Sequence, residues 1–560
     1  MVKTTALSLE YIASIPEVVS VKRMVRGETN RDYSEGKTAH KANKVHSAYT
    51  GKGIRVGVIS DTASQLSKLV ASGDLPKDSS VVNGFDGYSV YGTGSSEGTA
   101  MMEVVYDMAP GVSLRFASAG GTCESYADAI YALFDAGCKI IVDDMGFLDD
   151  IAFQDGPVSQ AVNYVTDHNG IYITCACNFG SYANRYADDP DNPAYAVWQG
   201  DFSAFTGTVP VSAGTDYEWL NFGSGLFSNI IADPYVGTDT RVIKPFILQW
   251  SDPDGKSAND YDLYLVKLVP SLWGVSYSVI STSCQTQNGK GHPIELVSYD
   301  NANGAQALMV RKKKSAEKRM LRLQGMKCKL QIGHEGAIFG HHANSNAITV
   351  AAAQCPSNRV FQTSDPVETF SSDGPGYRFF WPDGKAMTKG YVQANAVKIE
   401  KPDITAADGV TTASDGFSPF YGTSASAPHV AGIVALMLEA NPSLSPAQVK
   451  RILRQSVFGT SSWNNLSGCG IVDAQLCVNN AKTATTSYTI KFAANGGTGT
   501  MASMTCKQNA IYRLTKNAYK KSGKTFKGWR GSNGKRYDDQ VLIFNLALPE
   551  TVLTLTAVWE

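Results

Sequence analysis

Residues 422–432 read Gly-Thr-Ser-Ala-Ser-Ala-Pro-His-Val-Ala-Gly and run directly into the apolar segment from Ile433 to Met437. This pattern predicts a buried helix with Ser424 at its N-terminal end. The first N–H groups of a helix have no partner inside the helix, and with the helix dipole they can stabilise an oxyanion. Gly422 lets another backbone approach closely. Ser424 is therefore a candidate nucleophile; the alternative is a capped, buried helix with an incidental serine.

The composition is that of an ordinary globular protein. The chain has 560 residues, of which 43% are hydrophobic and 18% charged, and its net charge is −1. This length is enough for three or four domains. The balanced charge argues against nucleic acid as a partner, and no apolar run is long enough to span a membrane.

Short apolar runs alternate with helical patterns over much of the chain. Residues 54–59 are rich in β-branched side chains and predict a buried parallel strand that ends just before Asp61. Further core strands are expected at 139–147, 171–174 and 347–353. Strands and helices that alternate in this way predict an α/β fold with a parallel sheet. In such sheets ligands bind at the carboxyl ends of the strands, where Asp61 is expected to lie.

The segment around Ser424 resembles the active-serine segment of the subtilisin-like serine proteases, or subtilases. Segments 370–375 and 401–410 resemble the same family, although Asp408 stands where proline is usual. The resemblance covers roughly residues 51–210 and 336–480. It implies a parallel sheet with helices on both faces, and a serine endopeptidase that acts on protein or peptide substrates without a cofactor.

The resemblance also assigns roles to single residues. Ser424 matches the nucleophile, Asp61 the aspartate of the triad, and Asn178 the amide that donates to the oxyanion. Glu97 stands where the family has its catalytic histidine. Asp144 is expected near the serine as an additional acid. His429 is expected to be packed inside the serine helix, and no other histidine fits the position of the base.

Glu97 has to work as a base for this chemistry. A carboxylate with its ordinary pKa of about 4.3 is a weak base, but burial and neighbouring carboxylates can raise that pKa by several units. We therefore expect a Ser-Glu-Asp catalytic set that favours acidic pH. One alternative is a degenerate subtilisin-fold protein that binds peptides or a surface partner. Another is an adhesin in which the protease core is only a scaffold.

The rest of the chain predicts additional parts. Alternating segments between residues 215 and 335 indicate an inserted β-sandwich. Motifs near the C-terminus, Phe492–Gly499, Phe526–Trp529 and Leu555–Trp559, resemble the Listeria-Bacteroides repeat of surface and secreted bacterial proteins. They imply a secreted or cell-surface protein whose leader is absent from this sequence. The expected parts are a propeptide remnant and exposed linker (1–50), a protease domain in two parts (51–214 and 336–480), the sandwich (215–335), a polar linker (479–487) and a β-rich domain (488–560).

No metal site is predicted. The ten cysteines show no Cys-x-x-Cys or zinc spacing, and Cys175 and Cys177 point the same way from one strand and are poorly placed to bridge. The acidic loop at 252–255 fails the spacing of a calcium loop, so structural calcium has no motif behind it.

Overall fold

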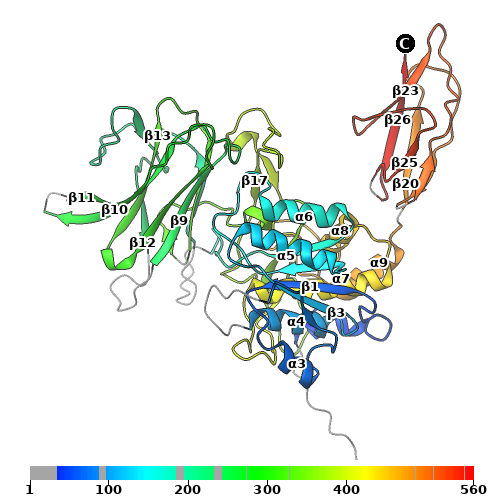
Figure 1. Cartoon of the computed structure of the whole chain (residues 1–560), viewed down its shortest axis with the longest axis horizontal. Coiled ribbons are helices and arrows are strands. Elements are labelled where there is room, and N and C mark those ends of the chain that lie inside the picture. Colours follow the sequence, from blue (N-terminus) through cyan, green and yellow to red (C-terminus); the bar gives the residue numbers. More distant parts are fainter. Residues whose placement is uncertain are drawn as a thin grey trace, which may run out of the picture. The chain divides into compact units, whose positions relative to one another are not determined.

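The computed structural model describes residues 34–86, 96–184, 195–232 and 243–560, apart from positions 273, 327, 486, 509 and 548. The predicted propeptide remnant before residue 34 lies outside these ranges. The described residues form a parallel sheet covered by helices, a β-sandwich and a small C-terminal β unit (Figure 1). The predicted fold class is therefore confirmed. Among these residues, none of the helices has the length and apolar character needed to cross a membrane.

A seven-stranded sheet forms the centre of the α/β part. Its strands lie in the order β19-β16-β5-β4-β1-β3-β2, and all neighbours run parallel. The chain enters at β1 in the interior and builds the sheet outward in both directions. The strands are β1 (Arg55–Ser60), β2 (Ser80–Val81), β3 (Ser113–Ser118), β4 (Ile140–Asp143), β5 (Ile171–Cys175), β16 (Ile348–Gln354) and β19 (Ile404–Asp408).

Alternate side chains of these strands enter two separate cores. Val58 and Val142 pack in the larger core with α4 (Glu97–Met108) and α7 (Thr423–Ala440). Ile59 and its neighbours pack in the smaller core with α5 and α6 on the other face. The remaining helices are α2 (Gly36–Ala39), α3 (Leu66–Ser72), α5 (Cys123–Asp135), α6 (Pro157–Asp167), α8 (Pro446–Gln455) and α9 (Ala474–Thr483).

Two packed sheets form the inserted sandwich. One has the order β11-β10-β13-β8-β15, with β7 also paired to β13, and the other has the order β12-β9-β14-β6. Aromatic and aliphatic side chains such as Trp250 and Leu263 fill the space between them. Because β6 belongs to this sandwich, the insert includes residues before position 215, where the sequence predicted it to begin. The strands are β6 (Val197–Asp201), β7 (Tyr217–Trp219), β8 (Asn229–Ala232), β9 (Ile243–Trp250), β10 (Tyr261–Ser271), β11 (Gly274–Ser283), β12 (Ile294–Asp300), β13 (Gln306–Lys313), β14 (Met320–Gly325) and β15 (Lys329–Leu330).

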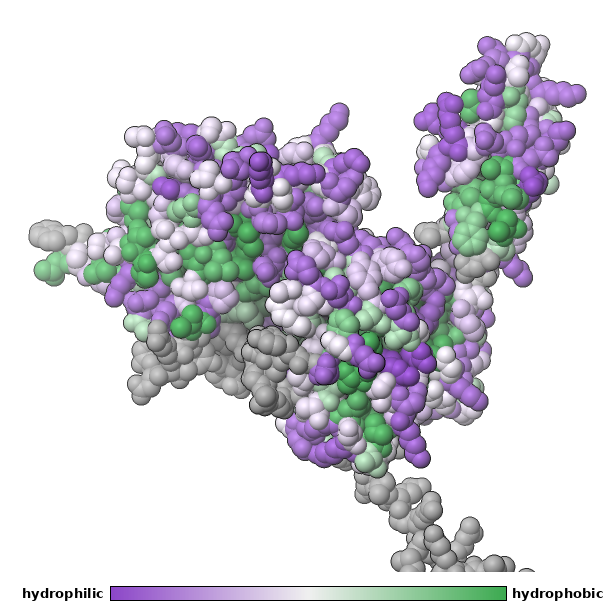
Figure 2. Space-filling model, in the orientation of Figure 1, coloured by the Kyte–Doolittle hydropathy of each residue, from purple (hydrophilic) through white to green (hydrophobic). Residues whose placement is uncertain are grey.

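The C-terminal unit has a core of its own around Trp529. Ile511 and Phe544 face each other in the β22–β25 ladder and are both exposed. Figure 2 shows a hydrophobic area on this unit. Its strands are β20 (Ser487–Ala493), β21 (Met504–Lys507), β22 (Ile511–Arg513), β23 (Phe526–Gly531), β24 (Arg536–Tyr537), β25 (Leu542–Phe544) and β26 (Val552–Trp559).

The exposed linker expected up to Lys44 is wrong for the described residues that follow position 33. Ala39, His40 and Ala42 are fully buried. Gly36 lies so close to His429 of α7 that a Cβ at this position would come within 2.0 Å of the ring. The apolar residues here are small and are spaced among lysines. The basic composition therefore does not indicate that this segment packs on the core.

Glu439, in the last turn of α7, anchors the chain where it enters the central sheet. Its Oε2 accepts hydrogen bonds from the backbone N–H groups of Thr50, Gly51 and Lys52 at 2.6, 2.6 and 3.1 Å. These residues directly precede β1. One carboxylate therefore accepts hydrogen bonds from three backbone N–H groups that lie outside the helices and strands.

Replacing Glu439 with alanine should lower the free energy of unfolding by about 2 kcal/mol, because hydrogen bonds to a charged acceptor are lost together. Glu400→Ala is the matched control, since it removes only a surface ion pair to Arg454 and should cost at most about 1 kcal/mol. Thermal and denaturant unfolding measure both variants. Equal losses in the two variants would contradict the anchoring role.

Candidate functional site

The carboxyl edge of the central sheet gathers the polar residues singled out by the sequence. Asp61 follows β1, Asp144 follows β4 and Asn178 follows β5 after a short turn. Strands β1 and β4 are direct neighbours, and β5 comes next. Because parallel strands end at the same edge, residues far apart in the sequence meet there.

Glu97 is the first residue of α4, and its helix begins against the loop that follows β1. The N–H of Gly98 donates to the carbonyl of Thr62 at 3.1 Å. A Cβ on Gly98 would lie 2.6 Å from that carbonyl oxygen and 2.3 Å from the ring of Phe116, so only glycine fits. This close approach holds Glu97 beside Asp61.

Ser424 is the second residue of α7 and only 6% exposed. Gly422 before it has a φ of 106°, which favours glycine strongly. The N–H of Gly422 donates to Oδ2 of Asp408 at 3.2 Å. Burial and the charge of Glu368 raise the pKa of Asp408 to about 7. The residue that departs from the family's usual proline therefore supports the turn that leads into the serine.

Ser424, Glu97 and Asp144 lie together at this edge, where the side chains of Ser424 and Asp144 interact with the Glu97 carboxyl. Burial raises the pKa of Glu97, and the charge of Asp61 raises it further. Burial and then the charge of Glu97 raise the pKa of Asp144 well above its ordinary value. Two adjacent, partly buried carboxyls are thus set to share one proton, and their titrations are coupled.

Asp61 is buried with 4% of its surface exposed, and its Oδ1 accepts the N–H of Thr62. The hydroxyl of Ser60 donates to Oδ2 of Asp144 at 3.2 Å. The cluster therefore contains three carboxyl groups, with donors from the end of β1 that support two of them.

Asn178 is held with its amide group beside the serine turn. Its Oδ1 accepts from the backbone N–H and the hydroxyl of Thr423 at 3.0 and 2.9 Å. The backbone donor fixes which end of the amide is oxygen. The Nδ2 group would lie 3.1 Å from a Cβ on Gly422, next to Ser424. The backbone nitrogen of Ser424 would lie 3.7 Å from the same Cβ, so the Asn178 amide and the Ser424 N–H lie on one side of the serine.

The eight histidines of the chain all lie in its described part, and each contacts a partner other than Ser424. His429 is fully buried in α7, where its Nδ1 contacts the carbonyl of Ala425. Burial lowers its pKa to about 3, so it is neutral. The other contacts are His40 to Val472, His46 to Met108, His168 to Tyr164, His292 to Asp254, His334 to Gln199, His341 to Asp150 and His342 to Thr174.

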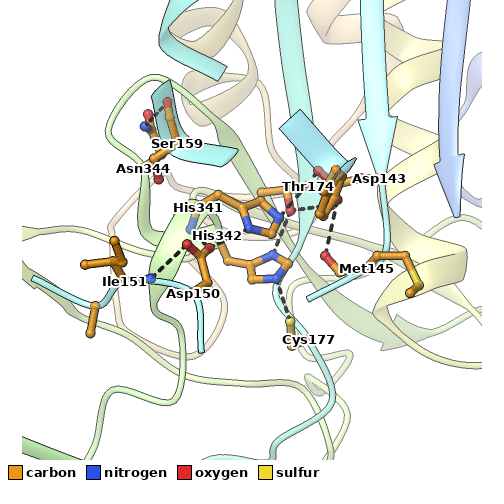
Figure 3. Close-up of polar contacts among 12 residues, drawn as sticks. Asp143, Met145, Asp150, Ile151, Ser159, Thr174, Cys177, His341, His342 and Asn344 are labelled. Carbon is orange, nitrogen blue, oxygen red and sulfur yellow. Dashed lines mark hydrogen bonds and ion pairs between the residues drawn. The ribbon is translucent and has the colours of Figure 1, made fainter. Parts of the chain in front are cut away.

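A second group of polar residues lies buried beside this edge (Figure 3). His341 contacts Asp150 at 2.9 Å and lies 3.7 Å from Asp143. Against the effect of burial, these two carboxylates raise the pKa of His341 to about 10. His342 lies between Thr174 and Cys177. The described residues hold two sets with metal-ligand atoms close together, Cys175–Cys177–His342 and Asp143–His341–His342. Sequence spacing did not reveal them, because the histidines come from a distant segment.

A buried serine at a helix N-terminus, a carboxyl network and an oriented amide on a parallel sheet define a hydrolase-type site. The sequence model of the subtilase family, Peptidase S8, matches residues 87–470. The chain therefore belongs to the subtilase family.

Several known proteins resemble parts of the chain. Subtilisin-like protease 1 of Plasmodium berghei (strain Anka) is 42% identical over 80 residues, which are 14% of this chain and 13% of that protein. Serine protease AprX of Bacillus subtilis (strain 168) is 33% identical over 140 residues, 24% of this chain and 29% of that protein. The chain thus spans less than a third of the length of either relative. The crystal structure of fervidolysin from Fervidobacterium pennivorans aligns with 84% of this chain and 52% of that one, at 12% identity and a TM-score of 0.34, which is too low to bear on the fold.

Removing the Asp408 carboxylate, which accepts the N–H of Gly422, should loosen the turn before Ser424. Asp408→Ala should speed hydrogen exchange at the Gly422 amide about 10- to 100-fold, because a hydrogen bond to a carboxylate is lost. Mass spectrometry of a peptide that covers residues 420–424 measures this exchange. Asp408→Asn keeps an acceptor oxygen and is the matched control. Exchange that is unchanged in Asp408→Ala would contradict the supporting role.

Proposed function

We propose that this protein is a serine endopeptidase with a Ser424-Glu97-Asp61 catalytic set, in which a carboxylate replaces histidine as the base. The observation that carries the proposal is the interaction of the Ser424 side chain with the Glu97 carboxyl. A nucleophilic serine needs a base close to it, and Glu97 is the carboxyl that lies there. Membership of the subtilase family supports the same activity.

The first half of the proposed reaction forms an acyl-enzyme. Oγ of Ser424 attacks the carbonyl carbon of the substrate peptide bond while its proton passes to Glu97. Negative charge develops on the carbonyl oxygen, where the Asn178 amide and the Ser424 N–H donate. Glu97 then gives the proton to the leaving amine, and the carbon–nitrogen bond breaks.

The second half returns the enzyme to its starting state. Glu97 takes a proton from a water molecule, and the resulting hydroxide attacks the ester carbonyl. The carbon–Oγ bond breaks and Glu97 returns its proton to Ser424. Asp61 acts on this cycle through its charge, because a nearby carboxylate makes Glu97 more basic. The chemistry requires no cofactor.

Asp144 is proposed to hold the shared proton. Its pKa lies well above the ordinary value, so the active form is ionised Glu97 next to protonated Asp144. In that form Asp144 donates a hydrogen bond to Glu97 and leaves a single negative charge between the two. Loss of this proton at higher pH would put a second negative charge close to the developing oxyanion.

The setting of the enzyme is also proposed. Protein or peptide substrates follow from the reaction. The resemblance of residues 488–560 to the Listeria-Bacteroides repeat favours a secreted or surface-associated protein, and the separate core of that unit supports an appendage.

A fluorophosphonate probe should label the wild-type protein and leave Ser424→Ala unlabelled, because the probe reacts only with an activated serine. The labelling rate should rise with pH through the raised pKa of Glu97, above about 4.3, since the base must be ionised. It should fall again when Asp144 ionises, and Asp144→Asn should remove that fall. Wild-type protein that stays unlabelled between about pH 3 and 8 would favour the peptide-binding alternative. A rate that increases up to alkaline pH would contradict the carboxyl base.

Glu97→Gln should lower kcat on peptide substrates about 10²- to 10⁴-fold with little change in KM, because the amide can accept from Ser424 but cannot take its proton. Glu103→Gln is the matched control: Glu103 is a buried glutamate on the same helix whose pKa burial raises to about 7, and its partners are Ala413 and Ser414. A similar loss of kcat in both variants would contradict the assignment of the base.

A further inference from the structure

Two thiols and an imidazole meet directly behind the proposed oxyanion amide. Cys175 ends β5, and Cys177 directly precedes Asn178. Sγ of Cys175 lies 3.9 Å from Sγ of Cys177, and Sγ of Cys177 lies 3.1 Å from Nε2 of His342. All three side chains are buried. Figure 3 shows the His342 ring between Thr174 and Cys177.

The hydrogen bonds around His342 leave its Nε2 as a lone-pair donor. The Thr174 hydroxyl donates to Oδ1 of Asp143 at 2.7 Å. A hydroxyl has one proton, so at its 2.7 Å contact with Nδ1 of His342 it must accept. Nδ1 therefore carries the ring proton, and the lone pair of Nε2 points at Cys177. Metal-binding histidines are held in this manner by a second shell that fixes the tautomer.

The spacing of the three atoms fits one tetrahedral cation. Zinc–sulfur bonds of about 2.3 Å and a zinc–nitrogen bond of about 2.0 Å put two sulfurs about 3.8 Å apart and sulfur about 3.5 Å from nitrogen. The two sulfurs already have this separation, and the distance from Cys177 Sγ to His342 Nε2 needs to open by a few tenths of an ångström. The ligand atoms of the whole set lie within 4.8 Å of one another. We infer that Cys175, Cys177 and His342 form a binding site for one zinc(II) ion, which goes beyond the proposed peptidase activity.

Gly146 lies directly against this ligand set. A Cβ at this position would lie 2.6 Å from Nε2 of His342 and 3.4 Å from Sγ of Cys177. Gly146 is itself exposed, so the ligand set lies close to the surface. In zinc sites with three protein ligands a water molecule takes the fourth position.

The neighbouring set of Asp143, His341 and His342 is a weaker candidate. Oδ2 of Asp143 and Nε2 of His341 have no hydrogen-bond partner among the described residues, whereas Nδ1 of His342 is engaged by Thr174. This set therefore offers oxygen and nitrogen atoms but no sulfur. Thiolates favour zinc and copper(I) over the hard cations that oxygen ligands would select, so the sulfur-containing set fits a thiophilic ion.

The test uses the full-length, reduced protein with zinc(II), and cobalt(II) as a spectroscopic probe. Equilibration with zinc followed by desalting and elemental analysis should give one zinc per chain. Cobalt should give thiolate charge-transfer bands and the strong visible bands of a tetrahedral site. Cys177→Ser and His342→Ala should each weaken binding at least tenfold. Cys355→Ser is the matched control, because this lone thiol has the same 8% exposure as Cys177.

Gly146→Ala provides a variant that keeps every ligand. It should weaken zinc binding because the added Cβ would crowd Nε2 of His342 and Sγ of Cys177, whereas Gly291→Ala, where a Cβ would meet nothing closer than 3.8 Å, should have no effect. Wild-type protein that retains no zinc, or bands that persist in Cys177→Ser, would overturn the inference. Because metal content and absorption need no catalysis, a failure here is separate from a failure of the proposed peptidase activity.

Discussion

Three carboxyl groups share a largely buried space with the candidate nucleophile, and the rest of the site is arranged around that constraint. Asp61, Glu97 and Asp144 cannot all be ionised, because like charges in a medium of low dielectric repel strongly. One proton shared by Glu97 and Asp144 relieves the repulsion. The Ser60 hydroxyl and the Thr62 N–H stabilise the other carboxylate oxygens. Burial thus raises the pKa of Glu97, which makes this carboxylate a stronger base than an exposed one.

The fold makes this arrangement possible by bringing two helix N-termini together at one sheet edge. Glu97 is the first residue of α4 and Ser424 the second of α7, and the dipole of each helix favours negative charge at that end. The helices pack closely because Gly432 of α7 has no side chain: a Cβ there would lie 2.3 Å from Cβ of Met108. Gly98 likewise lets the start of α4 lie close to the loop after β1. Two glycines in helices, where they cost stability, therefore let the N-terminal ends that carry Glu97 and Ser424 lie close together.

Much of this could be predicted from the sequence, and the parts that could not be predicted share a physical cause. Strands such as β1 and β5 follow from local patterns, and the positions of Asp61, Glu97 and Ser424 follow from motifs. The polar linker expected at 479–487 was wrong in its first half, because α9 continues to Thr483 and buries only Ala474, Cys477, Val478 and Ala481. Small buried residues among polar ones give only a weak hydrophobic pattern in the sequence. Contacts between distant segments, such as Asp408 with Gly422 or His342 with Cys177, have no local signal at all.

Asp143 and Asp144 connect the two polar clusters of the sheet edge. Side chains of neighbouring residues at the end of a strand point in opposite directions, so one carboxyl faces Glu97 and the other faces Thr174 and the histidines. Cys175 is close enough to Asp144 for a charge on its thiol to raise the pKa of that acid. A change in the charge of the thiol cluster therefore acts on the carboxyl that holds the shared proton. A cation bound by the thiolates would offset their negative charge and leave the pair of Glu97 and Asp144 to share its proton as before.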